Sequence, residues 1–364
     1  MVFFILFLLL IMFQEVKVAD ANGFMKDYLS KEKTNAIKGI FVILIIFSHY
    51  SQYVKLGGIY DKPYLILKNH LNQMVVSMFF FYSGYGMMEA TKKKGFEYIK
   101  GIPVKRFFTV LLNFDIAIVL FLIVGWFLGK TYDIKTILWS LIGWKSVGNS
   151  NWYIFAILGL YLIYFLAYFY LKWFEKYGEK RCYVGTILLT VGACAFVYFQ
   201  MKMGRPGYAY NTIILLPLGC WYSLLKKPIE KLVMHNDFIY TFTAMVVFFV
   251  YYTSFGFRWK YGIEGYSIWA ITFTLMVVLL TMKISFCNPV LSWFGNHVFS
   301  IYILQRIPMM ILQYRGLAAS HKYIFLIMAI ISTIFLAMVF DYFTGKLSNL
   351  ILSIYQKWTV KKEV

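Results

Sequence analysis

The chain alternates long apolar runs with short polar segments along most of its 364 residues. A helix needs about 20 apolar residues to cross the hydrocarbon core of a bilayer, and many of these runs approach or exceed that length. We therefore predict an all-α polytopic membrane protein with about ten core transmembrane helices. The predicted spans are 36–54, 73–90, 107–128, 151–171, 183–201, 209–225, 238–255, 265–282, 292–314 and 323–343.

Composition supports this prediction. Hydrophobic residues make up 61% of the chain and charged residues only 14%, which is more apolar surface than a soluble domain of this length needs. No internal repeat, low-complexity tract or soluble appendage interrupts the predicted helices. We expect a transmembrane domain over 33–346, preceded by an apolar segment and linker (1–32) and followed by a basic tail (347–364).

The first thirteen residues form an additional apolar run that is short for a span. We expect a short N-terminal helix, tilted or partly interfacial. A cleaved signal peptide is the alternative, because Ala19-Asp20-Ala21 resembles a cleavage site. Against it, no positive segment precedes the run, and cleavage would leave the lysine-rich stretch 26–38 outside the cell.

The net charge of +20 indicates topology rather than nucleic-acid binding. Lysines and arginines gather in short segments between apolar runs, as expected of positive-inside signals and contacts with anionic lipid. The richer segments are 14–35, 91–106, 172–182, 226–237 and the C-terminal tail. We predict that these are cytoplasmic, which places both ends of the helical core inside the cell.

Cysteines and histidines do not indicate a metal site or a disulfide framework. The four cysteines are scattered and form no CxxC pair, and the five histidines show no HExxH spacing. We therefore predict no bound metal and no bound cofactor.

His49 is the strongest candidate for chemistry. It lies in an apolar stretch that has no other ionisable residue back to Lys38. Ionisable groups at membrane depth usually serve chemistry or transport. Eleven helical residues return to within about 20° of the same face and rise roughly 16 Å, so Lys38 would lie near the cytoplasmic interface and His49 further out. A neutral imidazole is a good general base or acyl acceptor near pH 7; the alternative is a histidine that only packs between helices.

Two segments suggest a donor side. MFFFYSGYG (78–86) offers the Ser83 hydroxyl and, at Gly84, close access to the backbone. The basic stretch 94–108 contains Lys105 and Arg106, which suit phosphate groups. The alternatives are a small-residue packing surface for the first segment and ordinary positive-inside charge for the second.

Two later segments suggest an acceptor side. Trp152, after the polar pair Asn149 and Asn151, suits an outer aromatic belt or a sugar-stacking surface. In 291–309, Gln305 and Arg306 interrupt an apolar run, and an arginine at membrane depth should face a cavity or a partner.

In this order, the motifs resemble those of the acyltransferase 3 family, membrane-bound O-acyltransferases that act on bacterial surface glycans among other acceptors. The family's R-x10-H is similar to Lys38 with His49, its SG[FY] to Ser83-Gly84-Tyr85, and its S-x-Y-L-x-H to 300–305. Lys38 stands where the family has arginine, and Gln305 where it has histidine.

The resemblance implies transfer of an acetyl or other short acyl group from cytoplasmic acetyl-CoA to a hydroxyl of a polysaccharide or lipid-linked oligosaccharide. It makes His49 and Lys38 the catalytic candidates, in a multi-pass protein of a bacterial plasma membrane. The predicted donor and substrate contacts are Ser83, Gly84, Lys105, Arg106, Trp152, Tyr302 and Gln305. The competing hypothesis is a transporter, flippase or polymerase of envelope glycans in which His49 relays protons.

Overall fold

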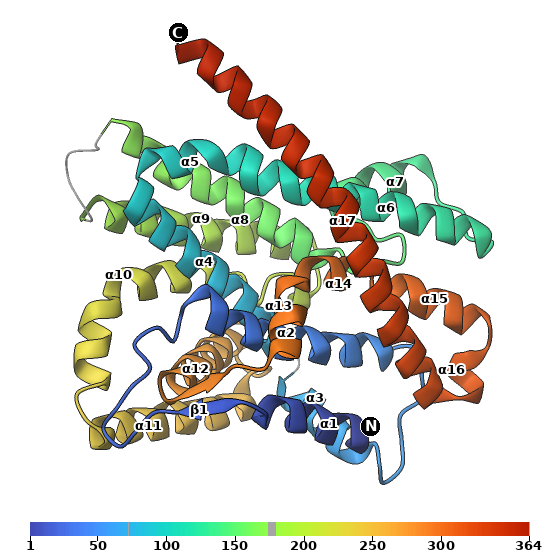
Figure 1. The fold of residues 1–364 in the computed structure, drawn as a ribbon, viewed down its shortest axis with the longest axis horizontal. Helices are drawn as coiled ribbons and strands as arrows, with labels where there is room; N and C mark the ends of the chain where they lie inside the picture. Colours follow the sequence, from blue (N-terminus) through green and yellow to red (C-terminus); the bar gives the residue numbers. More distant parts are fainter. Residues whose placement is uncertain (72, 174–179, 364) are drawn as a thin grey trace. The chain divides into compact units, whose positions relative to one another are not determined.

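The computed structural model describes residues 1–71, 73–173 and 180–363, and these residues are almost entirely helical (Figure 1). The chain divides into two compact units. Unit 1 comprises Met1–Leu44, Gly57–Ile99 and Ile163–Asn296, and unit 2 comprises Ile45–Leu56, Lys100–Leu162 and His297–Val364. The all-α prediction is confirmed, and the expected short N-terminal helix is present as α1 (Val2–Phe13).

Unit 1 holds most of the first half of the chain and the helices from α9 onward to α13. Its elements include α1, β1 (Val16–Val18), α3 (Lys62–Leu71), α4 (Met74–Lys94), η2 (Phe169–Lys172), α9 (Lys180–Lys202), η4 (Gly207–Ala209), α10 (Leu215–Val233), α11 (Asp237–Phe257), α12 (Gly262–Lys283), β2 (Ile284–Phe286) and α13 (Pro289–Asn296). It also takes in residues 31–44 of α2 (Lys31–Tyr50), 96–99 of α5 (Phe96–Ile102) and 163–168 of α8 (Trp152–Tyr168).

The closest packing in unit 1 joins α4 to α10. A Cβ on Gly84 would lie 2.0 Å from the backbone oxygen of Leu216, and one on Gly219 would lie 2.1 Å from that of Phe81. The two glycines therefore let the helix backbones touch, as small residues do between membrane helices. α11 and α12 lie side by side, visible in Figure 1.

A small antiparallel sheet of β1 and β2 also belongs to unit 1. Val16 pairs with Phe286 and Val18 with Ile284, which ties the linker after α1 to the end of α12. The sequence prediction contained no strand, because three residues on each side give too short a pattern to distinguish from loop.

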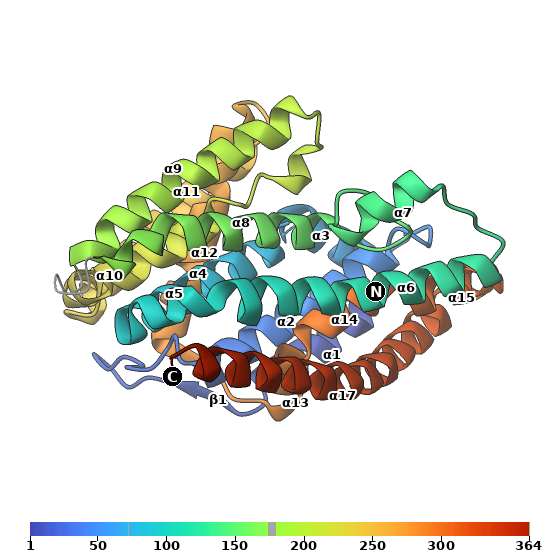
Figure 2. The ribbon, with the colours of Figure 1, turned by 90° about the horizontal axis from the view of Figure 1, so that it is seen from above.

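Unit 2 is built around two long helices, α6 (Thr109–Phe127) and α17 (Lys322–Glu363), both prominent in Figure 2. Its buried apolar side chains include Phe114, Phe121, Ile303 and Phe325. The other elements are residues 45–50 of α2, 100–102 of α5, η1 (Pro103–Phe108), α7 (Ile134–Leu141), 152–162 of α8, α14 (Val298–Leu304), α15 (Arg306–Tyr314) and α16 (Leu317–Ser320).

Within the described part of the chain, six helices are long and apolar enough to cross a membrane. They are Phe96–Phe127, Trp152–Lys172, Lys180–Lys202, Asp237–Phe257, Gly262–Lys283 and Lys322–Ile351. Three further predicted spans fall on α2, α4 and α10, helices of 20, 21 and 19 residues whose ends carry charged side chains. The chain is thus a multi-pass helical membrane protein, while the count of ten spans stays a prediction.

One predicted span, 292–314, is wrong as a single helix. The segment forms α13, α14 and α15, with breaks at His297 and Gln305. Pro308 has no N–H to donate to the carbonyl of Leu304, and its ring crowds that carbonyl, which weakens the helical hydrogen bonding between α14 and α15. The break places Gln305 and Arg306 at a helix junction rather than along a helix side.

Helix boundaries differ from the predictions elsewhere as well. The third predicted span, 107–128, begins at Phe96, because the chain stays helical through α5 and a π-helical segment, η1, before α6. Predicted span 209–225 begins only at Leu215, after the short turn η4. Of the basic segment 172–182, residues 174–179 lie outside the described residues.

Candidate functional site

His49 lies in the last turn of α2, in the part of that helix that belongs to unit 2. The helix runs without a break from Lys31 to Tyr50, so the predicted spacing from Lys38 is helical throughout. The His49 side chain is 9% exposed, among apolar neighbours on the same helix such as Ile45 and Ile46. Such a position suits an imidazole that works in a low-dielectric setting.

Ser150 is the nearest polar neighbour of His49. It lies in the loop before α8, and its Oγ is 3.3 Å from His49 Nε2. The loop is held by Asn149, whose Oδ1 accepts hydrogen bonds from the backbone N–H of Val147 at 3.0 Å and from Ser146 Oγ at 3.1 Å. This local network fixes Ser150 without using its side chain, so the hydroxyl faces His49.

Arg306, the first residue of α15, completes the cluster. Its Nε donates to Ser150 Oγ at 2.7 Å, and its guanidinium also donates to Gln52 Oε1 at 2.5 Å. A hydroxyl that accepts from Arg306 keeps one proton and one lone pair, so it can donate to an unprotonated His49 Nε2 or accept from a protonated one. In the tautomer that carries the imidazole proton on Nδ1, Nε2 is the basic nitrogen and faces the Ser150 hydroxyl.

Aromatic rings form the apolar wall beside this cluster. The ring of Tyr302 lies 6.3 Å from that of His49 and 5.5 Å from that of Tyr153, in a T-shaped arrangement with the latter. Trp152 packs edge to face on Tyr153 at 6.1 Å. The predicted residues His49, Tyr302 and Trp152 therefore belong to one neighbourhood of unit 2.

Gln305 lies at the junction of α14 and α15 and is fully buried. Its Nε2 donates to the carbonyl of Tyr302 at 3.2 Å, and its Oε1 has no hydrogen-bond partner among the described residues. A buried carbonyl oxygen in this condition is costly.

The three predicted residues of unit 1 lie in other surroundings. Lys38 Nζ donates to Asn35 Oδ1 at 2.8 Å, and Asn35 in turn donates to Asn296 Oδ1 at 2.6 Å. Ser83 Oγ contacts the sulfur of Met87 at 3.8 Å. Gly84 is accounted for by the close packing of α4 on α10.

Lys105 and Arg106 lie on η1 in unit 2. Lys105 is exposed and Arg106 half-buried, and both occupy a π-helical turn that begins at Pro103. π-Helical turns inside helices occur often at functional sites. The two cations thus sit on a helix and not, as predicted, in the loop before one.

Ser150, Gln52 and Tyr153 were absent from the predicted site. Ser150 stands between Asn149 and Asn151, both noted for their polarity, yet a single serine in a loop carries no pattern of its own. Arg306 interrupts an apolar run, which predicts that it faces a cavity or a partner but does not identify that partner. A loop brings these residues together, and the spacing of apolar residues along the sequence does not predict how a loop folds.

The cluster can support acid–base chemistry at a hydroxyl. A basic imidazole nitrogen, a hydroxyl and a fixed cation lie in sequence, so a proton can be taken up at Nε2 while the guanidinium stabilises negative charge. In residues 1–71, 73–173 and 180–363, no group of three or more histidine, cysteine, aspartate or glutamate side chains is arranged to hold a metal ion.

The fold and cluster define a multi-pass helical membrane protein with a buried histidine site. A family model described as an acyltransferase domain, that of acyltransferase 3, matches residues 33–342. The chain belongs to this family and is a membrane acyltransferase. Searches of curated proteins and of solved structures found no significant match.

Proposed function

We propose that the protein is an O-acyltransferase that moves an acetyl, or another short acyl group, from acyl-CoA to a hydroxyl of an envelope glycan. The acceptor is a cell-surface polysaccharide or a lipid-linked oligosaccharide. The observation that carries the proposal is the chain of contacts from His49 through Ser150 to Arg306. Family membership favours acyl transfer over a transporter, flippase or polymerase, in which the histidine would relay protons.

In the direct route, the acceptor hydroxyl takes the place of the Ser150 hydroxyl at His49 Nε2 and gives up its proton there as its oxygen attacks the thioester carbonyl. The C–O bond forms, the C–S bond breaks, and the CoA thiolate leaves and takes up a proton. Arg306 stabilises the negative charge that develops on the carbonyl oxygen, an effect worth a factor of about 10² to 10³ per donor in other enzymes. Ser150 keeps the imidazole and the guanidinium aligned.

In the two-step route, His49 Nε2 itself takes the acyl group, CoA departs, and the acceptor hydroxyl then displaces the imidazole. Both routes use the same nitrogen. A trapped acyl-His49 species, detected by mass spectrometry in the absence of acceptor, would identify the second route.

For the donor, we propose that Lys105 and Arg106 bind the phosphates of CoA on the cytoplasmic side. Two cations on one π-helical turn provide adjacent donors, and an arginine suits a phosphate in bidentate fashion. Lys38 and Ser83 remain proposed donor contacts from the motif alone. The orientation with both core termini in the cytoplasm, in a bacterial plasma membrane, is part of the same proposal.

The test is a radiolabel transfer assay with purified protein in nanodiscs. Acetyl-CoA labelled in the acetyl group is mixed with a panel of envelope polysaccharides and lipid-linked oligosaccharides. The proposal predicts label on at least one glycan in an alkali-labile ester. Label that stays on CoA with every acceptor, or that reaches an alkali-stable amide, would contradict it.

A further inference from the structure

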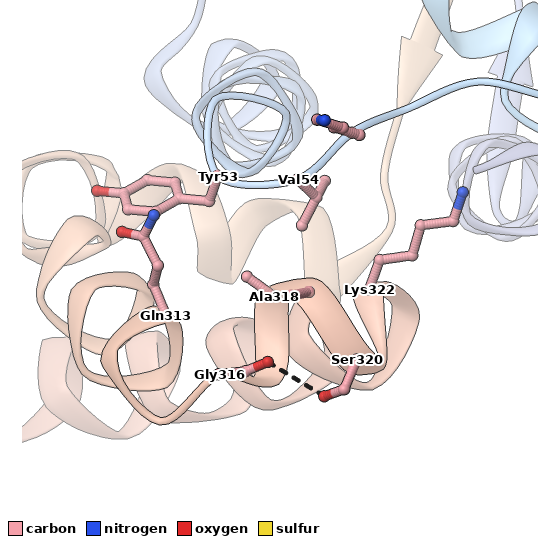
Figure 3. A pocket seen from close by; sticks show the side chains of 9 residues that line it. Tyr53, Val54, Gln313, Gly316, Ala318, Ser320 and Lys322 are labelled. Carbon is pink, nitrogen blue, oxygen red and sulfur yellow. Dashed lines mark hydrogen bonds between the residues drawn. The ribbon is translucent and has the colours of Figure 1, made fainter.

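A cavity of about 630 Å³ opens in unit 2 just beyond the histidine cluster, and Figure 3 shows it from close by. This volume is within the range of about 300 to 1,000 Å³ that ligand sites usually have. The lining residues come from the loop after α2 and from the segment that joins α15, α16 and α17: Tyr53, Val54, Lys55, Gln313, Gly316, Ala318, Ala319, Ser320 and Lys322.

One residue of the cavity wall, Tyr53, contacts the candidate site. Tyr53, on its wall, has its ring 6.0 Å from the guanidinium carbon of Arg306. Arg306 donates to Ser150, which lies against His49. Tyr53 also follows His49 by one helical turn, beyond the end of α2 at Tyr50. One wall of the cavity is therefore shared, through Tyr53, with the arginine of the cluster.

The charge of the lining is one-sided. Lys55 and Lys322 contribute two cations, and none of the nine described lining residues is acidic. The two segments that supply the lining, 51–58 and 311–323, contain no aspartate or glutamate. Lys322 is also the first residue of α17, where a positive side chain opposes the helix dipole. An anion in the cavity would therefore meet two positive side chains.

The rest of the lining suits a sugar. The ring of Tyr53 offers an apolar face, Gln313 an amide that can donate and accept, and small residues at Ala318 and Ala319 leave room. The α16 turn has a fixed shape, because Gly316 has a φ of +77° and its carbonyl accepts from Ser320 Oγ at 3.1 Å. In Figure 3, Val54 and Ala318 face each other across the space.

We infer that this cavity binds the acceptor and that the acceptor is an acidic glycan, one that carries a carboxylate or a phosphate near the hydroxyl to be acylated. The inference rests on the proposed function and adds the substrate class. Lys55 and Lys322 bind the anionic group, and Tyr53 stacks on the sugar ring.

The experiment measures binding in the absence of any acyl donor. The intact protein is placed in phosphatidylcholine nanodiscs, and trigalacturonate and its fully methyl-esterified form serve as probes of equal shape and different charge in calorimetric titrations. We expect the acid to bind and the neutral ester to bind at least about tenfold more weakly, with affinity for the acid falling as salt is raised.

Variants Lys55→Gln and Lys322→Gln should each weaken binding of the acid about fivefold to tenfold, since each removes one charge-assisted hydrogen bond. Lys135→Gln is the matched control, because Lys135 is an exposed lysine of α7 in the same unit that does not line the cavity. It should bind the acid as the unaltered protein does.

Three results would overturn the inference: equal affinity for acid and ester, no binding of either, or equal affinity of all three variants. Displacement of trigalacturonate by phosphatidylglycerol in the disc would also overturn it, by assigning the cavity to a lipid headgroup. Acetyl transfer is assayed separately on the same discs, so failure of the proposed function is distinguishable from failure of this inference.

Discussion

Ser150→Ala isolates the link between the imidazole and the guanidinium. The serine Oγ lies 2.7 Å from Arg306 Nε and 3.3 Å from His49 Nε2, and the residue is 6% exposed. Its removal leaves the buried His49 imidazole and the half-buried Arg306 without this partner, at a cost of about 1 to 3 kcal/mol in stability. A loosened imidazole should slow acyl transfer roughly 10-fold to 100-fold, equivalent to about 1.4 to 2.7 kcal/mol in the activation barrier.

The assay is initial-rate acetyl transfer by purified variants in nanodiscs, together with thermal unfolding. Ser150→Thr keeps the hydroxyl and should restore most of the rate. Rates are compared well below the unfolding temperature of each variant, so a loss of rate in folded Ser150→Ala is separated from its loss of stability. Ser140→Ala is the control, because Ser140 is a fully buried serine of unit 2 that donates only to the carbonyl of Ile137. A Ser150→Ala enzyme as fast as the unaltered protein would refute the reasoning.

Three further predictions concern other parts of the chain. Arg306→Lys keeps the positive charge but cannot donate to Ser150 and Gln52 together, so its transfer rate should fall about 10-fold. Arg306→Gln also loses the charge, and its transfer rate should fall about 10² to 10³-fold. Equal rates for the two variants would contradict a charge-stabilising role. Gly84→Ala should lower the unfolding free energy by about 1 to 3 kcal/mol or more, because the added Cβ would meet the backbone of α10; denaturant titrations measure this. Gly86→Ala is the control and should change the unfolding free energy little, because the space around Gly86 is open. The hydrogen bond from Lys33 lowers the pKa of Asp27 in the folded protein. The small stabilisation that results is complete above the unfolded-state pKa and is lost as the pH falls through the lower folded-state pKa. Asp27→Asn should therefore make the unfolding free energy less dependent on pH over this acid range.

The fold was predictable where apolar runs were long and uninterrupted. The helices α11, α12 and the apolar part of α17 were expected within a few residues of their observed positions, because a run of apolar residues in a membrane leaves the backbone no alternative to internal hydrogen bonds. The break at Gln305 was not predicted, because the apolar run resumes directly after Gln305 and Arg306 and its total length is that of one span. The β1–β2 pairing depends on a contact between distant segments and leaves no local pattern.

The site was predictable only in part, for a comparable reason. His49 is recognisable because an ionisable group in an apolar run is costly wherever it lies. Ser150 becomes significant only once a loop brings it to the imidazole. The close packing of Gly84 on α10 likewise depends on a distant segment, and its predicted substrate contact stays a prediction. The sequence shows which residues have side chains suited to catalysis, whereas tertiary contacts decide which residues they pair with.

The role of His49 is tested most directly by labelled acetyl transfer with the His49→Ala variant in nanodiscs, beside His235→Ala as an exposed-histidine control. If His49 is the base or the acyl acceptor, transfer by His49→Ala falls at least about 10²-fold, with unchanged elution on size exclusion, while His235→Ala stays at the unaltered rate. Transfer by a well-folded His49→Ala protein within a few-fold of the unaltered rate would contradict the account.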